Sequence, residues 1–195
     1  LQLQKEYVQA GTNILYAPTF TANRVKLAEY HLEKNMSSMI HDLVAISKEA
    51  AASTPGHPVY VAGDITMTGE QLRPMGKMEL EDLIAIYKEQ ILCLVDAGAD
   101  LLVVETMMSL AETRAALIAA KEVCDLPVIA TLTFEADGRT LFGTDAKTAA
   151  VVLESLGASA IGANCSTGPA QMEGIISDMI SVTMIPIIAK PNAGL

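Results

Sequence analysis

Residues 97–106 read Ala-Gly-Ala-Asp-Leu-Leu-Val-Val-Glu-Thr, and this stretch indicates the fold class. Gly98 follows a helical pattern over 79–97, in the position where a glycine with positive φ ends a helix. Leu101–Thr106 then forms a run that is apolar at successive positions, as expected of a strand buried on both faces. A helix, a glycine turn and a doubly buried strand together predict one repeat of a parallel α/β fold.

The same pattern recurs along the chain in both directions. Five further apolar runs, each followed by a polar or glycine-containing turn, cover Asn13–Phe20, Val59–Ile65, Val128–Phe134, Ala160–Ser166 and Ile185–Asn192. Helical patterns lie at 37–53, 79–97, 109–123, 145–156 and 169–181, and Gly157 closes one of them in the way that Gly98 does. Six consecutive repeats without a hydrophilic linker predict a single domain.

Two architectures fit this order of elements: a doubly wound open sheet and a barrel. A doubly wound nucleotide-binding sheet usually carries a glycine-rich turn after its first strand, whereas the first run here ends Ala17-Pro18-Thr19-Phe20. We therefore favour the (β/α)8 barrel. The chain has 195 residues, whereas a complete barrel takes ~250. We predict a partial barrel that lacks the first and last strands, and a single domain over 1–195 truncated at both ends.

Composition excludes several classes of function. The net charge is −10 and no basic stripe is visible, so neither nucleic acid nor an anionic membrane surface is an expected partner. No apolar run reaches membrane-spanning length, and the first residues show no signal-peptide pattern. Three cysteines, Cys93, Cys124 and Cys165, do not form a disulfide framework, which predicts a reducing, cytoplasmic location.

The barrel rule selects candidate site residues, because active sites of such barrels lie at the carboxyl ends of the strands. Acids, amides, hydroxyls and one thiol end the six runs and are expected at one rim: Thr19, Phe20, Asn23, Gly63, Asp64, Glu105, Thr106, Thr133, Phe134, Glu135, Asn164, Cys165, Lys190, Pro191 and Asn192. Histidines His31, His41 and His57 lie away from these ends. This argues against a Cys-His or Ser-His-Asp nucleophile.

Cys165 and Glu105 are the most informative of these residues. Cys165 has small neighbours, which leave room for a ligand, and it precedes a helix N-terminus, which favours a thiolate. An inert buried thiol is the usual alternative, and we accept it for Cys93 and Cys124. Glu105 ends an apolar strand, where a carboxylate is costly unless it meets a cation or hydrogen-bond donors, and an ammonium group is the natural ligand partner. That cation is either a ligand ammonium or a structural ion-pair partner. Asp64 follows the same logic, with a turn carboxylate as its alternative.

Asn164-Cys165-Ser166-Thr167-Gly168-Pro169 resembles the zinc-cysteine segment of the homocysteine S-methyltransferase family. Five other segments match that family in order: 17–23, 62–65, 100–106, 131–140 and 190–194. Each motif is weak alone, but six in order over essentially the whole chain are specific. Among the family, the cobalamin-dependent members are the most similar.

The resemblance implies a barrel that holds zinc through three cysteine thiolates. The first of them falls at Cys165, with Asn192 beside the metal as an exchangeable oxygen ligand. The other two form a Gly-Gly-Cys-Cys segment that this sequence does not contain. Glu105 would receive the ammonium group of homocysteine. The remaining substrate-binding residues implied are Thr19, Phe20, Asp64, Thr106 and Asn164.

The implied reaction is methyl transfer to homocysteine, giving methionine. A free thiol has a pKa near ~8.5, and coordination to zinc would ionise it for attack on a methyl group. The donor would be methylcobalamin, in a parent protein that also carries cobalamin- and folate-binding domains; betaine or S-methylmethionine are alternative donors. Two readings of another class stay open: a metal-free lyase or aldolase with Lys190 as its base, and an inactive homocysteine-binding fragment.

The incomplete set of cysteines leads to a first testable prediction. One thiolate and one amide do not replace three thiolates, so we expect residues 1–195 alone to bind zinc weakly or not at all and to lack methyl transfer. Titration of the purified 195-residue polypeptide with zinc against a chromogenic chelator measures this. Tight binding of one zinc per chain would refute it.

Overall fold

A computed structural model describes residues 1–194 as a six-stranded parallel sheet with helices on one side. The strands pair in chain order: β1 (Ile14–Tyr16), β2 (Tyr60–Ile65), β3 (Leu101–Met107), β4 (Val128–Leu132), β5 (Ala160–Asn164) and β6 (Ile187–Lys190). The helices are α1 (Gln2–Gln9), α2 (Arg24–Ala28), α3 (Met36–Ala51), α4 (Leu80–Asp96), α5 (Leu110–Val123), α6 (Ala146–Ser155) and α7 (Pro169–Ile180), with a 3-10 turn η1 at Glu33–Asn35. None of these helices has the length and hydropathy that crossing a membrane requires.

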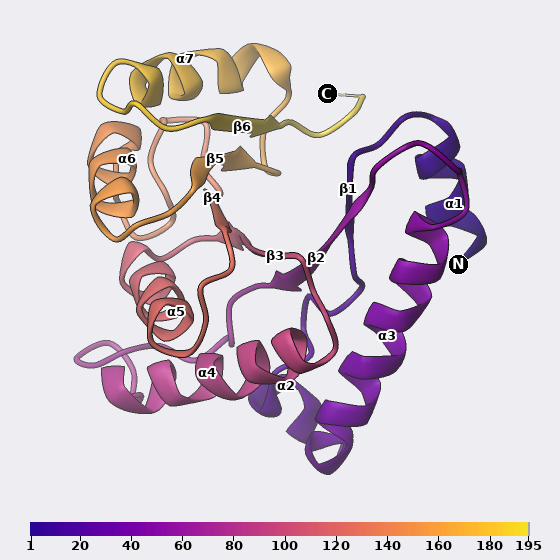
Figure 1. The fold of residues 1–195 in the computed structure, drawn as a ribbon. Coiled ribbons are helices and arrows are strands. Elements are labelled where there is room, and N and C mark those ends of the chain that lie inside the picture. The colour runs from indigo at the N-terminus through magenta and orange to yellow at the C-terminus, as the bar shows by residue number, and fades with distance from the viewer. Residues whose placement is uncertain (195) are drawn as a thin grey trace.

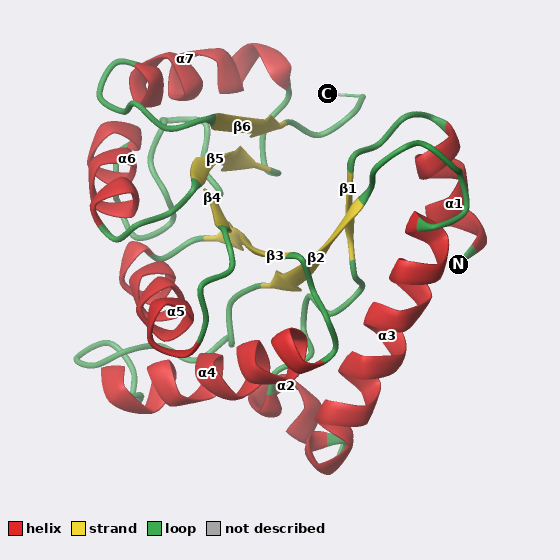
Figure 2. Ribbon diagram, viewed as in Figure 1, coloured by secondary structure: helices red, strands yellow, loops and turns green. Residues whose placement is uncertain are grey.

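The sheet is curled, with its strands on the inside and the helices around them (Figure 1; Figure 2). The ring stays open between β1 and β6, the two edge strands. Even so, the Lys190 ammonium on β6 lies 4.2 Å from the centre of the Tyr16 ring on β1. A doubly wound sheet would carry helices on both faces and hold its edge strands far apart. The partial barrel predicted from the sequence is therefore confirmed.

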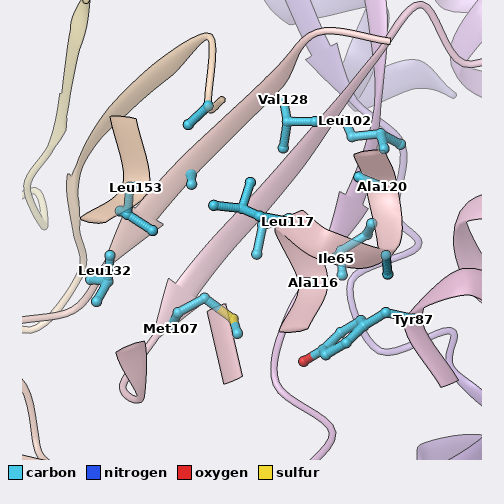
Figure 3. Close-up of a cluster of buried hydrophobic side chains, with 14 of the residues drawn as sticks. Ile65, Tyr87, Leu102, Met107, Ala116, Leu117, Ala120, Val128, Leu132 and Leu153 are labelled. Atoms are coloured by element: carbon cyan, nitrogen blue, oxygen red, sulfur yellow. The ribbon is translucent and has the colours of Figure 1, made fainter. Parts of the chain in front are cut away.

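Both faces of the four central strands, β2 to β5, are largely buried, which explains their continuously apolar runs. The outer face packs against the helices in the main core, where side chains such as Leu102 and Leu132 meet Leu117 and Leu153 (Figure 3). The inner face is lined by a smaller cluster of Ala62, Leu101, Val103, Ile129 and Ala160. The strands are therefore apolar at successive positions and not only at alternate ones.

Local signals set the helix ends. Gly98 and Gly157 both have φ of +87° just after α4 and α6, which confirms them as helix terminators. The five predicted helices end within two residues of the observed ones. Four of the six predicted strand runs were too long at their carboxyl ends, because residues such as Ala17 and Phe134 leave the sheet to form the rim loops. The short helix α2 was not predicted.

A buried carboxylate anchors the loop that follows β2. One oxygen of Glu112, on α5, accepts hydrogen bonds from the Thr68 amide (2.8 Å), the Thr68 hydroxyl (2.9 Å) and the Tyr87 hydroxyl (2.8 Å). Burial and then the nearby Glu112 charge raise the pKa of Tyr87 well above its usual value, so this phenol remains a donor. The network fixes one rim loop against α4 and α5.

Candidate active site

Alternation along the strands places one polar or aromatic side chain per strand near the carboxyl end of the inner face. In five of the six strands this side chain lies two positions after an apolar residue of the inner face, so it points the same way. The six side chains, in strand order, are Tyr16, Asp64, Glu105, Thr131, Asn164 and Lys190. The interior therefore changes from apolar to polar toward the rim.

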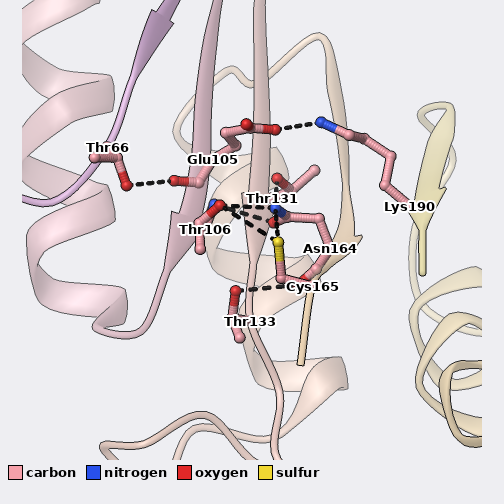
Figure 4. A network of polar contacts seen from close by, with 8 residues as sticks. All are labelled: Thr66, Glu105, Thr106, Thr131, Thr133, Asn164, Cys165 and Lys190. Atoms are coloured by element: carbon pink, nitrogen blue, oxygen red, sulfur yellow. Dashed lines mark hydrogen bonds and ion pairs between the residues drawn. The ribbon is translucent and has the colours of Figure 1, made fainter. Parts of the chain in front are cut away.

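A bulge shapes the end of β3. The register of β3 against β4 shifts between Val104 and Met107, and Thr106 adopts a φ of +59°, which is strained for a β-branched residue. Thr66 donates a hydrogen bond to the carbonyl of Glu105 at 2.8 Å and holds this turn in place (Figure 4). Maintained strain of this kind is typical of functional sites.

Asn164 organises the middle of the rim (Figure 4). Its side-chain oxygen accepts from the Thr106 amide at 3.0 Å and the Thr131 hydroxyl at 2.8 Å. Its side-chain nitrogen donates to the Thr106 hydroxyl at 2.8 Å and the Cys165 sulfur at 3.3 Å. These four bonds use the ordinary capacity of an amide. Asn164 thus positions Thr106 and Cys165.

The Cys165 loop is strained and lies against the chain that follows β6. Cys165 and Ser166 have φ of +60° and +55°. The Cys165 amide donates to the Lys190 carbonyl at 3.1 Å, and the Asn192 amide donates to the Thr167 carbonyl at 3.1 Å. The structure therefore brings the backbones of the predicted metal ligands Cys165 and Asn192 into neighbouring segments.

Glu105 is paired with Lys190 across the interior (Figure 4). The two side chains are 13% and 38% exposed. Burial alone would lower the pKa of Lys190, but its hydrogen bond to Glu105 and the charges of Tyr16 and Glu105 raise that pKa overall. The cation expected beside Glu105 is therefore a lysine ammonium, that of Lys190 on β6.

Asp64 lies beside this pair and is 6% exposed. Burial, and next the negative charge of Glu105, raise its pKa from 3.8 to about 8, against the opposing effect of Lys190. Within residues 1–194 its Oδ1 atom is buried and has no hydrogen-bond partner. A buried acceptor without a donor is costly in a native protein, so it calls for an explanation.

Three further predicted residues lie in the loop that follows β1. The hydroxyl of Thr19 donates to the Asp64 carbonyl at 2.9 Å and accepts from the Asp64 amide at 3.0 Å, so Thr19 links β1 to β2. Asn23 caps α2 through the Lys26 amide. Phe20 is half-buried in the loop after β1. Thr19 and Asn23 thus hold the rim loop in place.

The described residues do not by themselves provide a metal centre. Residues 1–194 contain no cluster of three or more His, Cys, Asp or Glu side chains placed to hold an ion. Cys165 is a thiol at the rim, whereas Cys93 lies in α4 and Cys124 directly follows α5. The donor set of the described residues therefore does not fit a three-thiolate zinc site.

Sequence reasoning missed two contributors to this rim. Tyr16 and Thr131 were not selected, because each lies one or more positions before the end of its predicted run. Lys190 was considered only as a base and not as the partner of Glu105. Counting alternate positions back from Phe20 and Asn192, the ends of two predicted runs, reaches Tyr16 and Lys190, whereas the same count from Phe134 does not reach Thr131.

Fold and rim together define a class of protein: a small-molecule-binding domain of the parallel (β/α) barrel type. All of residues 1–195 match the family model described as homocysteine S-methyltransferase. This chain belongs to the homocysteine S-methyltransferase family.

Individual relatives agree with the family. The chain is 30% identical to methionine synthase of Mycobacterium leprae (strain TN) and 30% identical to methionine synthase of Mycobacterium tuberculosis (strain ATCC 25618 / H37Rv), over 99% of its length in each case. It spans only 16% and 17% of those proteins. Among solved structures, the metallated form of the homocysteine methyltransferase MmuM from Escherichia coli superposes with a TM-score of 0.85 at 20% identity. The match covers 99% of this chain and 71% of the MmuM chain, which shows that the two share a fold.

Proposed function

We propose that this chain is the homocysteine-binding domain, over residues 1–195, of a methyltransferase of the methionine synthase type. Membership of the family and 30% identity to two methionine synthases support this proposal. The observation that carries it is the pairing of Glu105 with an ammonium group inside the polar rim. A carboxylate that already binds one ammonium there is suited to bind that of an amino acid.

The geometry suggests how this chain orients the substrate. Glu105 binds the ammonium, and the unpartnered oxygen of Asp64 provides a second acceptor beside it. Thr106 directly follows Glu105, and its hydroxyl lies 3.9 Å from the Cys165 sulfur. The ammonium-binding and sulfur-bearing parts of the site are therefore neighbours, and a short amino-acid side chain with a terminal thiol can reach from one to the other. Fixing both ends of the substrate lowers the entropic barrier to transfer.

The cofactors and partners are part of the same proposal. In this chain Cys165 and Asn192 would contribute two ligands to a zinc ion, and such an ion would supply the positive charge that favours the thiolate form of homocysteine. The further thiolates would come from outside residues 1–194. Methylcobalamin on another domain of the parent protein would be the methyl donor, alongside a folate-binding domain, and the cytoplasm is the proposed location.

Substitution of Glu105 tests the proposal. We expect Glu105→Gln to weaken L-homocysteine binding to the full-length protein by ~10–100-fold, because the charged acceptor for the ammonium is lost. Isothermal titration calorimetry under reducing conditions measures the affinity. Glu89→Gln is the control, since Glu89 forms an exposed pair with Arg24 outside the rim. Unchanged affinity in Glu105→Gln would contradict the proposal.

The lyase or aldolase alternative receives no support from the rim. Its Schiff-base chemistry needs a neutral amine, whereas Lys190 is held as an ammonium by Glu105. Borohydride trapping with a carbonyl substrate would reveal such an amine. No observation on the described residues favours this second function.

A further inference from the structure

The Glu105–Lys190 pair joins two strands that are not neighbours. Glu105 is on β3 and Lys190 is on β6, with β4 and β5 between them. The Lys190 ammonium also lies over the ring of Tyr16 on β1. Lys190 therefore spans the open interior at the level where the substrate would bind.

The local charges explain why a cation is needed there. Asp64 and Glu105 are close enough for the charge of Glu105 to raise the pKa of Asp64, and both side chains are largely buried. Without a ligand, Lys190 is the cation that offsets these two carboxyl groups. An incoming ligand ammonium would take over that function and leave the Lys190 charge without its carboxylate.

We propose that Lys190 binds the α-carboxylate of the substrate while Glu105 binds its α-ammonium, so that the resident ion pair is exchanged for two ion pairs with an amino-acid zwitterion. This inference rests on the proposed function and adds to it the residue that selects for a free carboxylate. The exchange leaves the net charge of the site unchanged, because a zwitterion carries none. A ligand that had only the ammonium would leave the Lys190 charge uncompensated.

Features of Lys190 suit it to this exchange. Its side chain is 38% exposed and ends a flexible four-carbon stem, so the ammonium can withdraw from Glu105 without moving β6. The Tyr16 ring provides a second site for the cation during the exchange. Its backbone is fixed independently, because the Lys190 carbonyl accepts from the Cys165 amide.

The test compares two ligands that differ only in the carboxylate. L-homocysteine and 3-aminopropane-1-thiol are titrated by calorimetry into the full-length protein and into Lys190→Met, Lys190→Arg and Lys48→Met variants. We expect Lys190→Met to reduce the preference for homocysteine over the aminothiol by at least ~10-fold. The affinity for homocysteine should fall, and the affinity for the aminothiol should rise. Lys190→Arg retains a cation and should keep the preference.

Lys48→Met is the matched control. Lys48 pairs with Asp100 at 2.7 Å, and its side chain is 38% exposed, as that of Lys190 is. Its removal should leave the ligand preference unchanged. If Lys190→Met changes both affinities by the same factor, Lys190 is a competitor for Glu105 alone and the inference is wrong. If the unaltered protein binds no homocysteine, the proposed function itself fails, and the inference fails with it.

Discussion

Replacing Gly162 with alanine is expected to lower the free energy of unfolding by more than ~4 kcal/mol, or to leave β6 unpaired. A Cβ atom at this position would lie 1.8 Å from the Ile188 carbonyl oxygen and 2.7 Å from the carbonyl carbon. These are backbone atoms of the strand that pairs with β5, with Gly162 and Ile188 in register. They cannot move aside without breaking the ladder, so the clash is not relieved by a change of rotamer.

Chemical denaturation followed by circular dichroism measures the effect. Gly174→Ala is the matched control, because Gly174 lies within α7 and an added Cβ meets nothing within 4 Å. That control should be neutral or stabilising by up to ~1 kcal/mol, since alanine is the better helix former. Equal denaturation midpoints for Gly162→Ala and the unaltered chain would show that the two strands approach less closely than described.

The close contact at Gly162 is an example of a feature that could not be predicted from the sequence. From the sequence, the small residues before Cys165 were read as leaving room for a ligand. The structure gives Gly162 another reason, the close approach of the Ile188 backbone. That reason involves a strand 26 positions further along the chain, so no local pattern contains it.

Local patterns predicted well what local physics determines. Burial of both sheet faces produced the six apolar runs, and glycines with positive φ ended α4 and α6 as expected. The carboxyl-end rule likewise selected Glu105, Asn164 and Cys165 as rim residues. What each rim residue contacts was not predictable in the same way. Asn164 was expected to bind substrate, yet its amide is used by Thr106, Thr131 and Cys165, on three different segments.

Asp64→Asn is expected to make the protein more stable above about pH 4, by an amount that grows until about pH 8. The pKa of Asp64 is about 8 in the folded chain, compared with 3.8 for an ordinary aspartate. Between these two values the folded state keeps a proton that the unfolded state has lost, so the free energy of unfolding falls as pH rises. Asparagine removes this dependence. The variant and the unaltered chain should be equally stable below about pH 4 and differ by ~5–6 kcal/mol at pH 8 and above.

Urea denaturation across this pH range measures the difference, and Asp145→Asn provides a control of opposite sign. Hydrogen bonds from Thr148 lower the pKa of Asp145, so that carboxylate stabilises the fold above its ordinary pKa, and its loss should destabilise the chain at neutral pH. If the difference in free energy of unfolding between Asp64→Asn and the unaltered chain does not grow as pH rises, Asp64 is solvated in the folded chain and is not held for a ligand. If the variant is instead more stable than the unaltered chain and also binds homocysteine less tightly, the buried carboxyl group lowers stability but provides an acceptor for the substrate ammonium. The carboxyl group is then kept for binding at the expense of stability.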